Sequence, residues 1–196
     1  MRNLIVTGLL LCVLSGLPGC KSVVSDHLIG EPLEAEQAQA YEGTWRLDDS
    51  VQHIKHLDGA DLLVAGLEWD EDTFKLNQHH VVVTIHHDTR FAMMAAEDEE
   101  DGGAAPAGAD GEKPWLLLGM VAASGDDALV LYAPDFDRFK RAFDEGKIQG
   151  ELSEDGNTLH IKGDKASLDA LVNPDTLHEL FEMQNPGVMQ RVGKLQ

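Results

Sequence analysis

The sequence predicts an α+β domain, in which an antiparallel, strongly curved sheet or partial barrel has C-terminal helices packed on it. Three observations predict this class. Short apolar runs that alternate with polar residues follow one another between residues 41 and 132. The connections between these runs are short turns, which join antiparallel neighbours, whereas parallel strands need long crossovers. After Pro134 the apolar spacing changes from the period of a strand to that of a helix.

Residues 1–19 have the composition of a signal peptide. Arg2 supplies a positive charge, and Leu4 to Leu17 form an almost uninterrupted apolar run that is too short to span a bilayer comfortably. This segment is therefore expected to be an export signal and not a folded element. Its removal leaves a length typical of one domain, which we assign to residues 41–196.

The signal ends in Leu17-Pro18-Gly19-Cys20, which resembles the lipobox of bacterial lipoproteins. The resemblance implies cleavage after Gly19 and acylation of Cys20, which would attach the protein to a membrane through acyl chains. Pro18 departs from the usual pattern, and an ordinary secretory signal or an uncleaved anchor stays open as the alternative. Lys21 stands where an Asp would favour the inner membrane, so the resemblance favours a periplasm-facing protein of the outer membrane.

The chain carries 15 Lys and Arg against 35 Asp and Glu, a formal net charge of −20. Such a body repels nucleic acid and anionic lipid surfaces, so a partner steered by charge is expected to be a basic envelope protein or a divalent cation. Plain solubility is the simpler interpretation of the charge. Cys12 lies in the signal and Cys20 would carry lipid, which leaves no cysteine for a disulfide, a thiol nucleophile or a cysteine zinc cluster.

Residues 20–40 are predicted to be a lipidated tether that ends in a short helix. No period is sustained from Lys21 to about residue 31, which indicates a flexible leash. Pro32 and the residues after it have the start signal and the composition of a helix. The leash would let the domain stand off the bilayer.

The first strand is expected to begin near Tyr41 and to end at the turn residues Asp49 and Ser50. Residues 97–114 hold seven acids and one base among Gly, Ala and Pro, and are predicted to be a disordered loop inside a lengthened hairpin. An acidic lure for a basic partner is the functional alternative to this solvated insertion. The other predicted strands are Val51–Leu57, Leu62–Trp69, Thr73–Leu76, His80–His87, Arg90–Ala95, Trp115–Val121 and Ala128–Tyr132.

Pro134 and Asp135 mark the start of a predicted helix, and Gly146 is placed to end it. Phe136, Phe139 and Phe143 fall on one side of this helix, which should therefore lie on a face of the sheet. Core packing explains the three phenylalanines, and a pocket for an acyl chain is the alternative. The elements predicted to follow are a hairpin (Ile148–Leu152 and Leu159–Ile161), two helical pieces (Lys165–Val172 and Pro174–Met183) and a last strand (Val188–Val192).

Histidines come nearest to forming a metal site. Alternation places His86 and Asp88 on one face of their predicted strand, together with His80. His80 and His86 lie about 20 Å apart along that strand, too far to share one ion. Only His86 with Asp88, joined by His53 or His56 from an earlier strand, would make a tight zinc or copper site. Exposed histidines on the polar face of a sheet are the alternative.

No catalytic motif is visible, and neither enzymatic activity nor a cofactor is expected. The chain lacks a nucleophile elbow, a Ser-x-x-Lys pair and a phosphate loop that ends in Lys-Ser or Lys-Thr. Asp70 and Asp72 fit the start of a calcium-binding loop, but Lys75 occupies the position that requires glycine, which excludes that assignment.

Gly43-Thr44-Trp45, at the entry to the first predicted strand, resembles the Gly-x-Trp motif of lipocalin-like barrels. The resemblance implies that Trp45 closes the barrel floor under an arginine near the C-terminus, for which Arg191 is the candidate. It also implies carriage of an apolar small molecule. The helices predicted after Pro134 depart from an eight-strand meander, and a simple core role for Trp45 stays open.

The function expected from the sequence is that of a membrane-anchored, noncatalytic envelope lipoprotein that binds or scaffolds another component. The alternatives are a lipocalin-like carrier of an apolar small molecule and a histidine-based metal-binding protein. A carrier needs an apolar cavity, and a scaffold needs an exposed apolar patch. A metal-binding protein needs three converging ligands. Cys20 is the one modification site predicted, and no ligand-binding residue is assigned.

Overall fold

The computed structural model describes residues 21–48, 50–70, 73–95, 114–123 and 127–193. Cys20, the signal segment and nearly all of the predicted acidic loop lie outside these residues. Among the described residues, no helix is long and apolar enough to cross a membrane.

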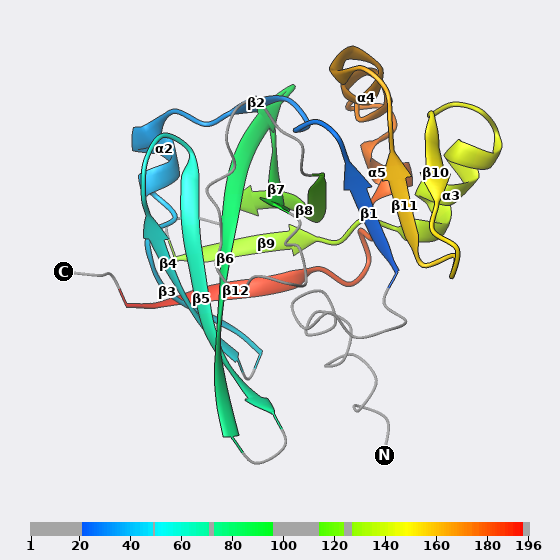
Figure 1. The fold of residues 1–196 in the computed structure, drawn as a ribbon. Helices are drawn as coiled ribbons and strands as arrows, with labels where there is room; N and C mark the ends of the chain where they lie inside the picture. Colours follow the sequence, from blue (N-terminus) through cyan, green and yellow to red (C-terminus); the bar gives the residue numbers. More distant parts are fainter. Residues whose placement is uncertain (1–20, 49, 71–72, 96–113, 124–126, 194–196) are drawn as a thin grey trace.

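Eight strands form a closed antiparallel barrel (Figure 1). Each strand pairs with the next along the chain, and the last one pairs with the first, which closes the ring. The antiparallel sheet is therefore confirmed, but the barrel is closed and not partial. The eight strands are β3 (Gly43–Leu47), β4 (Ser50–His56), β5 (Asp61–Asp70), β6 (Thr73–His86), β7 (Thr89–Ala95), β8 (Trp115–Ala123), β9 (Ala128–Tyr132) and β12 (Gly187–Gly193).

Tight turns set the antiparallel order. His87 and Asp88 are the two residues between β6 and β7, and they have φ values of 46° and 62°. Two consecutive positive φ values are what a two-residue type I′ hairpin turn requires, because its twist matches that of the paired strands. The predicted strands Thr73–Leu76 and His80–His87 are one continuous strand, β6, which pairs along its whole length with β5 and β7.

Alternation divides the barrel strands into an inner and an outer face. The inner face carries one hydrophobic cluster, whose largest fully buried member is Trp45, 1% exposed. A short helix, α2 (Ala35–Gln39), lies over the end of the barrel that is uppermost in Figure 1 and adds Ala38 to this cluster. The other buried members of the inner cluster are Leu33, Tyr41, Ile54, Ala60, Leu62, Val81, Val83, Ala92, Met94, Val121 and Leu129.

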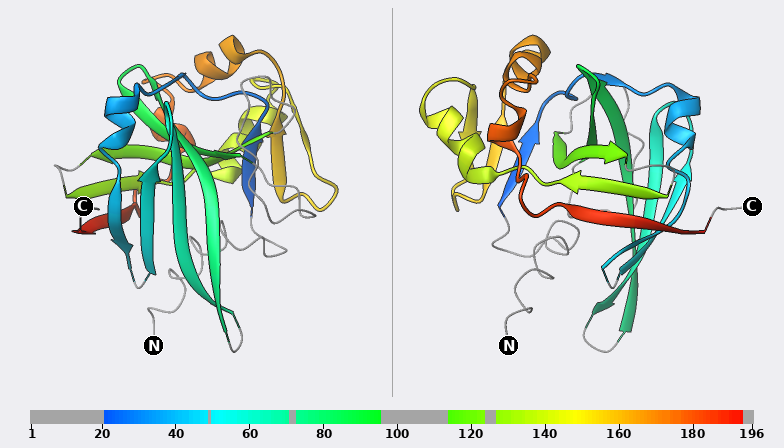
Figure 2. Two further views of the ribbon diagram at one scale, coloured as in Figure 1. Left: turned by 60° about the vertical axis from the view of Figure 1, so that its left-hand side comes forward. Right: turned by 180° about the vertical axis from the view of Figure 1, so that it is seen from behind.

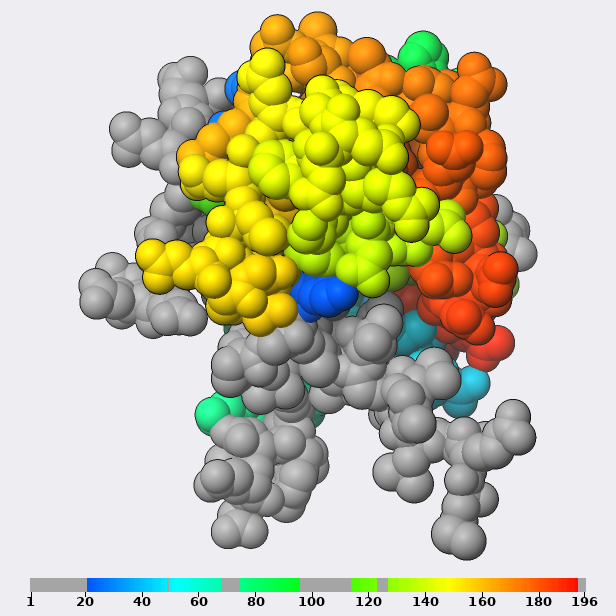
Figure 3. Space-filling view, turned by 90° about the vertical axis from the view of Figure 1, so that its right-hand side faces the viewer, coloured from blue at the N-terminus to red at the C-terminus, as the bar shows by residue number. Residues whose placement is uncertain are grey.

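A second layer covers the outer face of β7 and β8 (Figure 2), and Figure 3 shows this layer from its outer side. It contains the strands β1 (Ser22–Ser25), β10 (Gly150–Leu152) and β11 (Thr158–Ile161), and the helices α3 (Phe136–Asp144), α4 (Lys165–Leu171) and α5 (Leu177–Leu180). Phe181 joins this layer to the barrel, because its ring lies 5.9 Å from that of Phe91 on β7 and 6.0 Å from that of Phe139 on α3. The predicted packing of C-terminal helices on the sheet is thus present, between β9 and β12 in the chain.

The predicted leash is wrong, because the chain enters the sheet at Ser22. β1 pairs in parallel with β11 and antiparallel with β8, and Val23, Ser25 and Ile29 are buried. A second short strand, β2 (Glu31–Pro32), then pairs with β6 and leads into α2. The predicted short helix is present, but the residues before it are part of the folded body.

Candidate functional site

The interior of the barrel is sealed at its upper end by Trp45 and Arg191. The guanidinium carbon of Arg191 lies 4.2 Å from the centre of the Trp45 ring, and the Arg191 side chain is only 8% exposed. Arg191 also donates to the backbone carbonyls of Glu42 and Ala40, just after α2. Trp45 Nε1 donates to the carbonyl of Tyr41 at 2.8 Å. The structure therefore brings together the two residues that the Gly-x-Trp resemblance implied.

Tyr41 and Arg90 add a polar pair beside this seal. The Arg90 guanidinium donates to the Tyr41 hydroxyl at 3.1 Å. Burial raises the pKa of Tyr41, and Arg90 offsets only part of that rise, so the phenol stays neutral. Arg90 also lines a hollow of about 500 Å³, open to solvent, beside the turn between β6 and β7, with Ile85 and Val121.

Other apolar side chains of the barrel interior are less completely buried than Trp45. No described helix covers the end of the barrel that is lowest in Figure 1. Several apolar side chains of the inner cluster are only partly buried, and three polar side chains, Gln52, Asn77 and His79, share the inner face by alternation. A mostly apolar wall with a few polar groups is the usual lining of a small-molecule site. The partly buried apolar residues include Val64, Leu116, Leu118, Leu131 and Met189.

The four residues predicted as metal ligands are not brought together. His53 Nδ1 contacts the Thr44 hydroxyl at 3.0 Å, and His56 Nε2 contacts the Gly59 carbonyl at 3.0 Å. His86 contacts the backbone of α4, and Asp88 lies in the turn that follows. Within the described ranges, no group of three His, Cys, Asp or Glu side chains could hold a metal ion.

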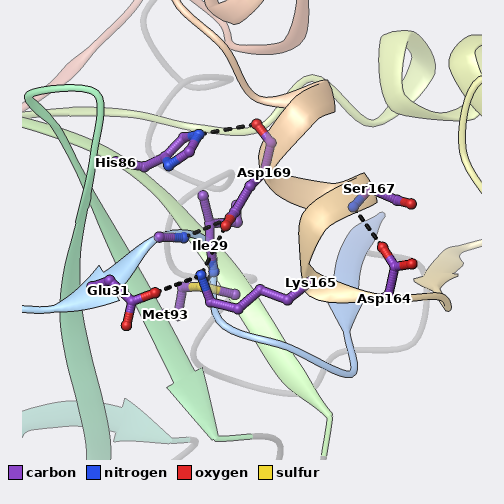
Figure 4. Close-up of polar contacts among 9 residues, drawn as sticks. Ile29, Glu31, His86, Met93, Asp164, Lys165, Ser167 and Asp169 are labelled. Carbon is purple, nitrogen blue, oxygen red and sulfur yellow. Dashed lines mark hydrogen bonds and ion pairs between the residues drawn. The ribbon is translucent and has the colours of Figure 1, made fainter.

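His86 instead belongs to a polar latch that holds α4 to the barrel (Figure 4). His86 Nε2 donates to the carbonyl of Asp169 at 3.0 Å. The Asp169 carboxylate accepts from the Gly30 amide and from Lys165, each at 2.8 Å. Lys165 also pairs with Glu31 at 2.9 Å. The latch therefore ties together the chain before β2, the end of β6 and α4.

The latch lowers the pKa of Asp169. Burial acts to raise this pKa, but the hydrogen bonds from Lys165 and from the Gly30 amide together outweigh it. A lowered pKa in the folded state means that the carboxylate contributes stability above its unfolded pKa, and that this contribution is lost as the pH falls through the folded value.

Replacing Asp169 with asparagine is therefore expected to lower the free energy of unfolding by about 1.5–3 kcal/mol at neutral pH, the usual range for hydrogen bonds to a charged group. The difference from wild type should shrink as the pH falls below about 4, where carboxylates become protonated. Urea unfolding followed by circular dichroism at several pH values measures both effects. Glu154→Gln, at an exposed carboxylate, is the control. A pH-independent difference would contradict this account of the latch.

Sequence reasoning missed the latch for identifiable reasons. Lys165 and Asp169 are four residues apart in a predicted helix, which is the spacing of a helical ion pair and was a usable signal. The contact of Asp169 with Gly30 joins residues that are 139 positions apart, and nothing local indicates it.

The fold and interior together define a class: a closed antiparallel β-barrel, sealed at one end by a Trp and Arg pair, with a helical layer on its outer face. No family model, curated protein or solved structure matches this chain.

Proposed function

We propose that this chain is a lipid-anchored, noncatalytic binding protein of the bacterial cell envelope whose barrel takes up an apolar small molecule. The single observation that carries the proposal is the asymmetry of the barrel interior. One end is sealed by Trp45, Arg191 and α2, while several apolar side chains of the inner cluster stay only partly buried. A closed barrel with one sealed end and partly buried apolar inner side chains is suited to hold a ligand, since eight-stranded barrels have room for one small molecule.

The chemistry of the inner wall favours a neutral, mostly apolar ligand. The described arginines of the wall already have partners, since Arg191 lies on Trp45 and Arg90 binds Tyr41. The net charge of −20 further disfavours anions. This assignment supports the lipocalin-like alternative, and the helices after β9 leave the eight-strand meander intact because they lie outside the barrel.

The membrane anchor rests on the sequence. The lipobox resemblance at residues 17–20 supports acylation of Cys20, and Lys21 supports the outer membrane. A body with so many acids gains nothing from electrostatic attraction to anionic lipid, so the acyl chains would provide the attachment. A basic envelope protein is the partner that this charge would favour.

A scaffold that binds another protein is the second candidate. The observation in its favour is a set of exposed apolar side chains on the outer face of the barrel, including Leu67 and Leu76, which are 64% and 58% exposed. Leu67 on β5 and Leu76 on β6 are directly paired on these two neighbouring strands.

Ligand binding in the barrel is tested by filling its interior. Met189→Trp places a large ring among the partly buried apolar side chains and should abolish binding of the neutral fluorescent probe N-phenyl-1-naphthylamine, which wild type should bind. The matched control is Val188→Trp, the neighbouring residue on β12, which is 44% exposed and faces outward. Fluorescence titration measures both variants, and urea unfolding checks that each is folded.

Two results would contradict the carrier. Wild type that fails to bind the probe would show that the interior is closed to apolar molecules. Equal binding by Met189→Trp and Val188→Trp would place the probe on the outer surface and favour the scaffold. Leu131→Trp repeats the test from β9 should Met189→Trp not fold.

A further inference from the structure

Three apolar side chains form an exposed row on the outer face of the barrel. Leu67 on β5 pairs directly with Leu76 on β6. Gln52 pairs with Gly66, so Val51 on β4 lies beside Leu67 on the same face. Val51, Leu67 and Leu76 are 42%, 64% and 58% exposed. We call these three residues the apolar row.

The N-terminal end of the described chain is fixed in the body and not on a leash. Lys21 is the only residue between Cys20 and β1, and its ammonium lies 2.6 Å from the carboxylate of Asp137 on α3. One or two extended residues reach at most about 7 Å. A lipid attached to Cys20 would therefore hold the folded body directly against the bilayer.

The hairpin that carries most of the row points to the same side as the start of β1. In the ribbon views β5 and β6 extend downward beyond the rest of the barrel (Figures 1 and 2). β1 runs upward, so the residue that follows Cys20 lies at the lower end of this strand. The start of β1 emerges at the lower edge of the outer layer (Figure 3). A rigid body held at one point by a short tether rests on a surface through that point and the farthest protrusion on the same side.

We propose that the apolar row is a membrane contact that orients the anchored protein on a zwitterionic lipid surface. This inference rests on the lipid anchor of the proposed function. These three side chains by themselves cover less than the about 800 Å² on each side that a stable protein interface needs. A tethered body needs only a weak second contact, because the tether keeps the local concentration of lipid high.

Charge decides which lipid fits. The sequence places four acids, Glu68, Asp70, Glu71 and Asp72, between Leu67 and Leu76 against one base, Lys75. Anionic head groups would repel this segment, whereas zwitterionic head groups would not. The contact is therefore driven by burial of the apolar row and weakened by anionic lipid, with higher salt reducing that weakening.

Chemical coupling tests the contact without natural acylation. Every described element lies within residues 21–193, so residues 20–196 contain the whole described fold, and Cys20 is their only cysteine. Its thiol is coupled to a maleimide lipid in phosphatidylcholine vesicles, and a sample blocked with N-ethylmaleimide is mixed with the same vesicles. Hydroxyl-radical footprinting then measures the solvent exposure of individual side chains.

The expected result is that oxidation of Leu67 and Leu76 falls in the coupled protein, while Val192, which is 62% exposed on β12, is unchanged relative to the blocked sample. Inserting a long Gly-Ser linker between Cys20 and Lys21 should restore oxidation of the two leucines. Replacing part of the phosphatidylcholine with phosphatidylglycerol should restore part of it.

Equal oxidation of the leucines in coupled and blocked protein would overturn the proposal. A uniform loss that includes Val192, or a loss that survives the linker, would also overturn it, because neither depends on the short tether. A loss in the blocked protein without vesicles that grows with protein concentration would assign the row to self-association instead. None of these outcomes depends on whether cells acylate Cys20 or whether the barrel binds a ligand.

Discussion

Replacing Cys20 with serine is expected to abolish incorporation of radiolabelled palmitate completely, because the thiol is the atom to which the acyl chain would be attached. The lipobox resemblance implies cleavage directly before Cys20, so the variant should also keep residues 1–19. Labelling in cells followed by mass spectrometry of the purified product measures both effects.

The chain supplies a matched control for that experiment. Cys12 is the only other cysteine, and it lies within the signal segment. Cys12→Ser should take up palmitate like wild type and should begin at residue 20. Label that persists in Cys20→Ser, or a wild-type product without lipid, would remove the anchor from the proposed function and leave the barrel to be tested by itself.

Truncation of Trp45 to alanine is expected to lower the free energy of unfolding by about 3–5 kcal/mol, the usual cost of removing a fully buried Trp. The variant leaves a cavity under α2, removes the bond to the Tyr41 carbonyl and leaves the guanidinium of Arg191 without its ring. Urea unfolding followed by circular dichroism measures the loss.

The control for Trp45→Ala is the next residue on β3, Arg46. Arg46 points outward from β3, is exposed and donates to the side chain of a surface glutamine, Gln190 on β12. Arg46→Ala should cost less than about 1 kcal/mol, as surface substitutions usually do. If Trp45→Ala cost no more than Arg46→Ala, the seal would not hold the upper end of the barrel together.

The strands of the barrel could be predicted from alternation, but its closure could not. Closure depends on β12 pairing with β3 and β9, and these contacts join residues far apart in the chain. The same limit explains the wrong prediction for β1, since its parallel partner β11 lies 136 positions further on. The sequence predicts two strands in place of β6 because the middle of β6 is polar, although Asn77 and His79 lie on the inner face of the barrel by alternation.

The candidate site was predictable only where a resemblance supplied it. The Gly-x-Trp motif pointed to Trp45 and, through it, to Arg191, and these residues are in contact. The partly buried inner residues, such as Met189, could not be distinguished from ordinary core by apolar pattern alone. The metal site predicted from the histidines is wrong. The spacing of residues along β6 contains no information about α4, and His86 contacts the backbone of that helix.

The position of β12 has a consequence for biogenesis. Because the strand that joins β9 back to β3 is the last of the described elements, the ring has an open seam until residues 187–193 are delivered. Pairing between such distant segments is slow compared with local hairpin formation. A growing polypeptide therefore cannot close its barrel until this segment is available, and for the export that we propose this keeps the chain competent for translocation.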